Sequence, residues 1–297
     1  MFQPRHLPAD HEGAYSPVPA RAGIGLKPKH FTGILENEPS ASWFEVHPEN
    51  YLVAGGPMHH YLTRIRADYP LSFHSVGMSL GSAEGPDPFH IQRLKNLCER
   101  YQPALVSDHL SWSRWNHTFL NDLLPLPYTR AALQLLLANV DKVQNLLGRS
   151  IAIENPSTYL ALAGSEMDEC DFLVELARQS GASILLDINN IHVSATNHGW
   201  SSLDYLQRIP VHLVSEIHLA GHKVEETAAG TLLIDDHGSQ VCPQVWALYE
   251  QALARLGPRP TLIEWDTDVP ELSVLYSEAA KADGFLLDVD IRERQHG

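Results

Sequence analysis

Short apolar runs alternate with longer amphipathic segments along this chain. Apolar residues recur at helical spacing over residues 129–147 before Gly148, and again between Asp168 and Gly181, between Pro243 and Gly257, and after Pro270. Short runs bounded by polar turns are typical of strands buried in a parallel sheet. We expect eight of them, over residues 22–26, 43–47, 71–74, 104–107, 150–154, 183–187, 213–218 and 260–264. This alternation predicts an α/β fold, a single (β/α)₈ TIM barrel.

The domain organisation follows from the same pattern. Residues 1–20 are rich in proline and polar groups, which predicts an irregular N-terminal arm, and residues 21–297 then hold the barrel. No linker rich in glycine, serine or proline divides these residues. A chain of 297 residues, 44% of them hydrophobic, is long and apolar enough for one such barrel.

Charge and composition narrow the function. A formal net charge of −15 argues against a nucleic-acid partner. No apolar run approaches the roughly 18 residues that a bilayer demands, and the N-terminus MFQPRHLPADHEG shows no signal peptide, so we expect a cytoplasmic protein and no membrane partner. Cys98, Cys170 and Cys242 are widely spaced, and we expect reduced, structural thiols.

The ends of the runs carry the candidate chemistry. A (β/α)₈ barrel gathers the C-terminal ends of its strands on one face, so a metal site is expected there. A carboxylate at the mouth of a buried strand, such as Glu154, must be paired or metal-bound. Both interpretations are open, but the chain has only 21 lysines and arginines, which favours metal. The runs end at or beside Gly25, Glu49, His74, Asp108, Glu154, Asp187, His218 and Glu264.

Further polar residues extend this set. Asn190 follows Asp187, while Asp235 and His237 lie in the loop after the seventh strand. Alternation points Glu216 and His218 the same way, so that one is a ligand and the other supports it. One ion takes at most about six ligands, so this many candidates predict two or three metals with bridging carboxylates. A nitrogen and oxygen set without cysteine suits Fe, Mn or Zn.

The motifs together resemble one family. The chain is similar to the multinuclear non-heme iron-dependent oxidative enzymes, formerly a family of unknown function, from about Ala22 to the last helix. That resemblance is carried by the segments GIGLKPKH, FEVHPENY, FHSVGMSLG, SDHLSW, NDLLPLPYT, IENPSTY, LLDINNIHVSATNHG, EIHLAGH, IDDHG and LIEWD.

The resemblance implies a xylose-isomerase-like TIM barrel holding two or three irons, mixed Fe(II)/Fe(III), with O₂ as co-substrate. It implies an oxidase that modifies cysteine residues of a ribosomally synthesised precursor peptide, sometimes alongside a small partner protein that presents the peptide. The residues it matches as metal ligands are His74, Asp108, Glu154, Asp187, Asn190, His218, Asp235, His237 and Glu264. Glu154, Asp187 and His109 are the expected catalytic residues.

Some assignments stay open on the sequence. Whether Asp108 or His109 is the direct ligand is undecided, as are the roles of His47 and Glu49. The loop 111–128, with Trp112, Trp115, His117 and Phe119, offers either a peptide groove or ordinary cover for the core. The competing functions are a zinc or manganese hydrolase or isomerase of phosphate or sugar substrates, and a non-catalytic metal-binding protein.

Overall fold

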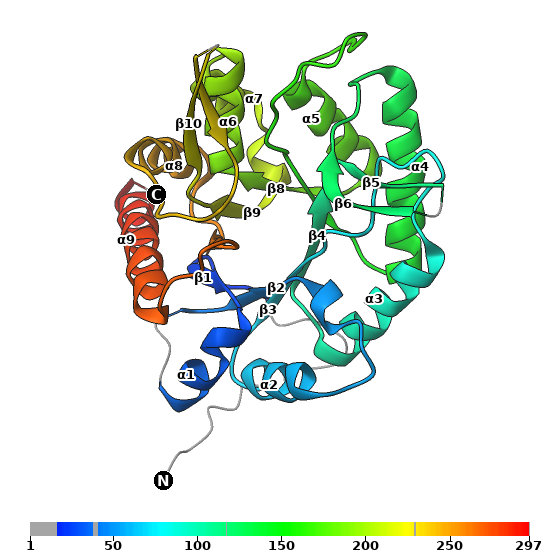
Figure 1. Ribbon diagram of the computed structural model, residues 1–297. Coiled ribbons are helices and arrows are strands. Elements are labelled where there is room, and N and C mark those ends of the chain that lie inside the picture. Colours follow the sequence, from blue (N-terminus) through cyan, green and yellow to red (C-terminus); the bar gives the residue numbers. More distant parts are fainter. Residues whose placement is uncertain (1–16, 38–40, 117, 229, 297) are drawn as a thin grey trace.

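The computed structural model describes residues 17–37, 41–116, 118–228 and 230–296. Eight parallel strands close into a barrel in the order β1-β12-β9-β8-β7-β4-β3-β2, and helices surround it (Figure 1). The predicted (β/α)₈ barrel is therefore confirmed, while most of the predicted N-terminal arm, as well as His117, lies outside the described residues. The barrel strands are β1 Ala22–Gly25, β2 Phe44–Val46, β3 Leu71–His74, β4 Leu105–His109, β7 Ala152–Glu154, β8 Ser183–Asp187, β9 Val214–Leu219 and β12 Thr261–Ile263.

Helices alternate with the barrel strands, and several begin at a side chain that caps the helix N-terminus. Thr129 caps α4 by accepting a hydrogen bond from the Ala132 amide at 3.1 Å, and Asp168 caps α5 through Asp171 in the same way. The α-helices are α1 Phe31–Glu36, α2 Pro57–Arg66, α3 Pro88–Tyr101, α4 Arg130–Leu147, α5 Glu169–Ser180, α6 Ile188–His198, α7 Ser202–Arg208, α8 Pro243–Leu256 and α9 Leu272–His296. Short 3₁₀ helices lie at Pro28–His30, Pro48–Tyr51 and Val211–Leu213.

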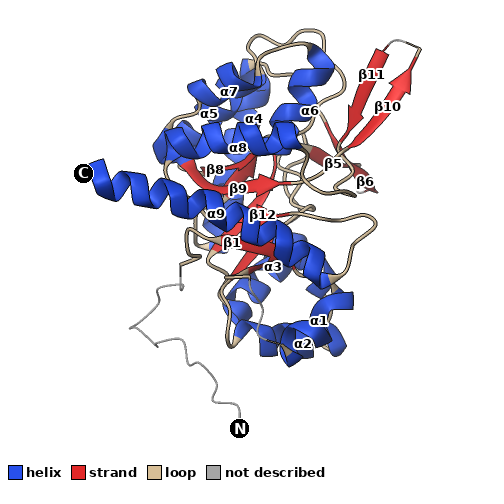
Figure 2. Ribbon diagram, turned by 90° about the vertical axis from the view of Figure 1, so that its left-hand side faces the viewer, coloured by secondary structure: helices blue, strands red, loops and turns tan. Residues whose placement is uncertain are grey.

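Two antiparallel hairpins, which the apolar pattern did not predict, follow barrel strands at their C-terminal ends. The strands β5 Trp112–Trp115 and β6 Thr118–Leu124 follow β4, and β10 Lys223–Thr227 and β11 Gly230–Ile234 follow β9. Figure 2 shows both hairpins on the same side of the barrel. They therefore stand at the end of the barrel where the predicted ligands meet.

The last helix ties the barrel closed. Arg21, directly before β1, makes two hydrogen bonds of 2.9 and 2.7 Å with the carboxylate of Asp283 in α9. The same carboxylate accepts a 2.7 Å hydrogen bond from the amide of Ala22. Because β1 pairs with β12 as well as with β2, this contact anchors α9 where the first and last strands meet.

Candidate metal centre

The ends of six barrel strands bring acids and histidines together at the mouth of the barrel. His74 ends β3, His109 ends β4, Glu154 ends β7 and Asp187 ends β8. His218 lies near the end of β9, and Glu264 follows β12 directly. All except His109 are almost completely buried. Burying this many ionisable groups costs free energy unless they are paired or hold a cation.

The first group consists of His74, His109 and Glu154. The two Nε2 atoms are 3.2 Å apart and lie 3.1 and 3.2 Å from Glu154 Oε2. Two nitrogens bound to one ion at about 2.0–2.1 Å stand roughly 3 Å apart, so this spacing fits a shared metal. On its other side, His74 Nδ1 lies 2.8 Å from the Ser107 hydroxyl, which fixes the ring as a supporting hydrogen bond does in metal sites.

The second group consists of Glu154, Asp187, His218 and Glu264. Each offers one ligand atom, and these atoms lie within 4.8 Å of one another. His218 Nδ1 is 3.0 Å from Glu264 Oε2. Asp187 Oδ2 is buried and has no hydrogen-bond partner among the described residues. Because Glu154 belongs to both groups, its carboxylate is placed to bridge two ions.

Asn155 and Asn190 hold this second group in place. The Asn155 side chain donates to Asp187 O at 2.9 Å and accepts from Asp187 N at 2.8 Å, so it continues the pairing of β7 with β8. Asp187 Oδ1 caps α6 by accepting from the Asn190 amide at 2.6 Å. Asn190 Nδ2 donates to Asn155 O at 3.0 Å. The buried Oδ1 of Asn190 has no hydrogen-bond partner in the described chain.

A third set lies beside the second, in the loop after β11. His237 Nε2 is 2.6 Å from Asp235 Oδ1, and His237 Nδ1 is 3.5 Å from Glu264 Oε2. His237 has a φ of 46°, in the left-handed region that non-glycine residues adopt at a cost of order 1–3 kcal/mol. The Asp266 amide donates to His237 O at 2.9 Å and helps to hold this conformation.

The electrostatics of the mouth favour positive charge. Burial alone would lower the pKa of His74, but the Glu154 carboxylate raises it to about 10. Burial would likewise lower the pKa of His237, and Asp235 and Glu264 raise it well above its usual range. Burial and the neighbouring Glu154 raise the pKa of Asp187 well above that of an ordinary aspartate. The crowded carboxylates thus raise the pKa values of their neighbours and favour bound protons. A bound metal cation would neutralise the same negative charge.

Asp108 is not brought into these groups, although it is adjacent to His109. Its Oδ2 accepts from the Met78 amide at 2.8 Å and its Oδ1 from the His109 amide at 2.6 Å. Glu49 also lies outside them, since its Oε1 accepts from the Ser75 hydroxyl at 2.6 Å and lies 3.3 Å from His90 Nε2. Both carboxylates therefore support loops around the mouth.

The remaining predicted and unpredicted residues surround the groups. His47 forms a smaller cluster with Glu264 and Asp266. The buried Glu45 in β2, which the sequence reasoning missed, lies 3.5 Å from His218 Nε2, and Glu216 lies 3.8 Å from the same atom. Ligand atoms of Glu45, Glu216 and His218 lie within 4.8 Å of one another, so the prediction from strand alternation that one of Glu216 and His218 is a ligand and the other supports it stays a prediction. The same alternation, applied to β2 between Phe44 and Val46, was the available signal for Glu45.

A cavity of about 420 Å³ opens over the three groups. Its floor includes His74, His109 and Glu154, and its walls include the apolar residues Leu123 and Leu124 from β6 together with Leu160. Trp115 and Phe119 of the same hairpin are 59% and 52% exposed. The loop 111–128 therefore contributes both a wall of the cavity and exposed aromatic surface.

The donors at the mouth fit divalent metal ions. They are imidazole nitrogens and carboxylate or amide oxygens from separate strand ends, several are left without partners, and neighbouring groups share carboxylates. Fold and site together define a (β/α)₈ barrel enzyme with a candidate multinuclear metal centre at its C-terminal mouth.

A family model matches the chain over residues 21–286, and the chain belongs to this family, described as the RiPP precursor modification enzymes MbnB/TglH/ChrH. RiPPs are ribosomally synthesised and post-translationally modified peptides. The chain is 48% identical over 268 residues to the UPF0276 protein RB0508 of Rhizobium meliloti strain 1021, covering 90% of this chain and 87% of the relative. It is 48% identical over 265 residues to a UPF0276 protein of Caulobacter strain K31, covering 89% and 96%.

Solved structures share the fold at low sequence identity. An L-ribulose 3-epimerase aligns with a TM-score of 0.62 and 13% identity, covering 93% of this chain and 98% of the other. Endonuclease IV from Thermus thermophilus aligns with a TM-score of 0.57 and 14% identity, covering 90% and 99%. These likenesses confirm the predicted xylose-isomerase-like barrel. In the described residues, no helix combines the length and apolar composition needed to cross a bilayer.

Proposed function

We propose that this protein is an O₂-dependent oxidase with two or three irons that modifies cysteine residues of a ribosomally synthesised precursor peptide. The observation that carries the proposal is the sharing of carboxylates between adjacent groups, Glu154 between the first two and Glu264 between the second and third. Membership in a family of RiPP precursor modification enzymes supports a peptide substrate.

We assign the ligands by group. His74, His109 and Glu154 hold one ion, Glu154, Asp187, His218 and Glu264 a second, and Asp235 and His237 with Glu264 a third. Asn190, whose Nδ2 lies 3.3 Å from Glu154 Oε1 and whose Oδ1 has no partner in the described chain, completes one of these sites. Of the two neighbours on β4, His109 is the ligand in this proposal because both oxygens of Asp108 already accept backbone hydrogen bonds. Glu154, Asp187 and His109 are the residues expected to act directly at the reacting ions.

Iron is the metal of the proposal because it binds nitrogen and oxygen donors and changes oxidation state. Bound in two oxidation states, it would supply both an acceptor for the substrate thiolate and electrons for O₂. The protein contributes the positions of the ligands around the cavity. Both histidines of the first group line the cavity, and the His109 side chain, at 11% exposed, is more open to it than that of His74, at 1%.

The cavity above the centre suits a cysteine-containing peptide segment. Its volume lies within the range of about 300–1,000 Å³ that is usual for small-ligand sites. The apolar walls at Leu123, Leu124 and Leu160 keep water away from the thiol, and the exposed Trp115 and Phe119 offer contacts for the flanking peptide or for a small presenting protein.

The test starts with metal analysis of anaerobically purified protein, and EPR and Mössbauer spectra then report the iron. A cysteine-containing peptide should produce a thiolate-to-iron absorption band and O₂ uptake, while the same peptide with serine should produce neither. Glu154→Gln should lose metal from two groups and abolish O₂ uptake. Glu278→Gln is the control, since Glu278 is also buried but accepts from the Val241 amide and belongs to none of the ligand groups.

Two outcomes would overturn the proposal. A colourless zinc or manganese protein without O₂ uptake would favour a hydrolase or isomerase. Unchanged peptide modification in Glu154→Gln would favour a metal-binding protein without catalysis at this centre.

A further inference from the structure

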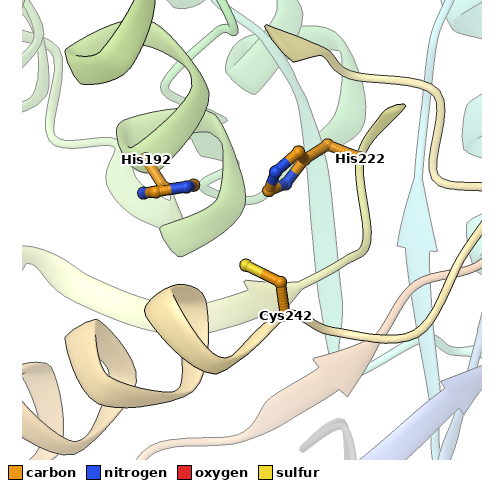
Figure 3. Close-up of side chains that lie close together, drawn as sticks. All are labelled: His192, His222 and Cys242. Carbon is orange, nitrogen blue, oxygen red and sulfur yellow. The ribbon is translucent and has the colours of Figure 1, made fainter. Parts of the chain in front are cut away.

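A second cluster of metal-binding side chains lies outside the centre. It comprises His192 on α6, His222 in the segment after β9, and Cys242 at the N-cap of α8. Each offers a ligand atom, these atoms lie within 4.8 Å of one another, and all three residues are half-buried. Figure 3 shows the three side chains directed toward one another from three separate elements. The cluster contains a thiol, which the ligand groups of the barrel mouth lack.

The cluster is held in place by contacts that leave its ligand atoms free. His222 Nδ1 donates to Asn189 Oδ1 at 2.8 Å, so Nε2 is the nitrogen available to a metal. Such a hydrogen bond to the far nitrogen is what orients metal-binding histidines. The His192 and His222 rings are adjacent, with centroids 5.2 Å apart.

The backbone around His222 is closely packed against the segment that leads to Cys242. A Cβ on Gly221 would lie 2.2 Å from Ser239 O, so only glycine permits this approach. The Ser239 hydroxyl donates to His222 O at 3.4 Å. These contacts place His222 and Cys242 on two segments whose separation is fixed.

We propose that His192, His222 and Cys242 form a binding site for a single Zn²⁺ ion, separate from the metal centre of the barrel mouth. Tetrahedral zinc with Zn–N of about 2.0–2.1 Å and Zn–S of about 2.3 Å places its ligand atoms roughly 3.3–3.6 Å apart. The observed limit of 4.8 Å is within small side-chain rotations of this geometry. A mixed nitrogen and thiolate set favours zinc over the hard cations, and a fourth position remains for water.

The proposed zinc site is connected to the barrel mouth by one side chain. Asn189 accepts from His222 and donates through Nδ2 to Asp235 Oδ1 at 2.8 Å. Zinc bound to His222 would fix this ring, the base of the β10–β11 hairpin and, through Asn189, the carboxylate of Asp235. The site is therefore expected to act as a clamp that positions Asp235, whichever metal the mouth binds.

Cobalt provides a readout specific to the thiol. Excess Co²⁺ added to the metal-free full-length protein should give a thiolate-to-cobalt charge-transfer band in the near ultraviolet, and its limiting intensity should correspond to one thiolate-bound cobalt per chain, while the mouth takes up further cobalt without adding to this band. Nitrogen and oxygen ligands at the mouth do not produce this band. Cys242→Ser should abolish it, and the variant should fold because serine is a good N-cap residue. Cys170→Ala, which removes a buried thiol on α5, should keep the band.

Two further measurements complete the test. Excess Zn²⁺ should displace the cobalt band and protect Cys242 from alkylation by iodoacetamide, and His222→Gln should raise the zinc concentration needed for this protection at least tenfold. Iron binding at the mouth of Cys242→Ser should keep its stoichiometry, which separates this proposal from the oxidase proposal. The zinc site is wrong if the band is absent, if it survives in Cys242→Ser, or if Cu(I) but not Zn²⁺ protects the thiol.

Discussion

Replacement of Asp187 by asparagine should separate metal binding from stability. Asp187 lies in the second ligand group, where its Oδ2 has no hydrogen-bond partner in the described chain. Asparagine has nearly the same shape, and its Oδ1 can still accept from the Asn190 amide at the start of α6. The substitution therefore removes an ionisable carboxyl group and a proposed metal ligand but keeps the helix cap.

The structure sets the size of the effect in metal-free protein. Ligand atoms of Asp187 and Glu154 lie within 4.8 Å of each other, and Glu264 belongs to the same group. Two unit charges at this distance repel by about 3 kcal/mol at an effective dielectric constant of about 20. Burial and this repulsion raise the pKa of Asp187, so the metal-free fold either holds the repelled charge or takes up a proton at a comparable cost, and asparagine avoids both. The neighbouring His218 offsets part of this repulsion. We expect Asp187→Asn to raise the free energy of unfolding of metal-free protein by about 1–3 kcal/mol.

Urea unfolding with chelator, and again with saturating metal, measures both effects. Metal should stabilise the wild type strongly and Asp187→Asn much less, because the variant lacks one ligand. Asp168→Asn is the comparison variant, since Asp168 also caps a helix, through the Asp171 amide, but belongs to no ligand group. Because its carboxylate accepts two hydrogen bonds from Arg208, this variant should lose stability rather than gain it. The reasoning is refuted if metal-free Asp187→Asn is no more stable than wild type, or if Asp168→Asn gains as much.

Three further predictions follow from single contacts. His109→Ala should lower the bound metal by one ion by elemental analysis, whereas Asp108→Asn should keep the metal count and lose about 1–3 kcal/mol of stability, because an amide nitrogen then meets a backbone N–H. Burial raises the pKa of Glu169 to about 7, although its carboxylate accepts from two tyrosine hydroxyls, so the wild type loses stability as the pH rises from about 4.5 through 7. In urea unfolding, Glu169→Gln should be more stable than wild type at pH 8 by about 1–2 kcal/mol, which is half of the full linkage value because the residue is partly exposed. Near pH 4 the variant and the wild type should be equally stable, and a difference that is the same at both pH values would contradict the prediction. Gly221→Ala should shift the thermal midpoint down by several degrees, since its Cβ would meet the Ser239 backbone, and an unchanged midpoint would count against that close contact.

The barrel could be predicted because its signals are local. Each buried strand is a short apolar run, and helices such as α4 carry their own caps at Thr129 and Gly148. The same reason made three strand-end residues predictable: His74, Glu154 and Asp187. Each ends its apolar run, and a (β/α)₈ barrel brings the C-terminal ends of all its strands to one face. The hairpins could not be predicted, because β10 is almost entirely polar and the apolar residues of β6 do not alternate strictly with polar ones, so neither sequence shows the period of a half-buried strand.

The choice between Asp108 and His109 depends on contacts that are distant in sequence. Neighbouring residues on a strand face opposite sides, so Asp108 and His109 point in different directions. The Met78 amide, which donates a hydrogen bond to Asp108 Oδ2, comes from the loop after β3. The sequence likewise gives no sign that Cys242 lies beside two histidines. Its partners lie 20 and 50 residues earlier, and only the closed barrel brings α6, α8 and the end of β9 together.

The distribution of the candidate ligands over separate strand ends has an evolutionary consequence. Each of His74, His109, Glu154, Asp187 and Glu264 is supplied by a different strand, while the apolar core below is shared by all of them. A single substitution at one strand end can therefore add or remove one donor without disturbing the sheet. In the proposed centre, the number of bound ions is therefore expected to change one residue at a time without a change of fold.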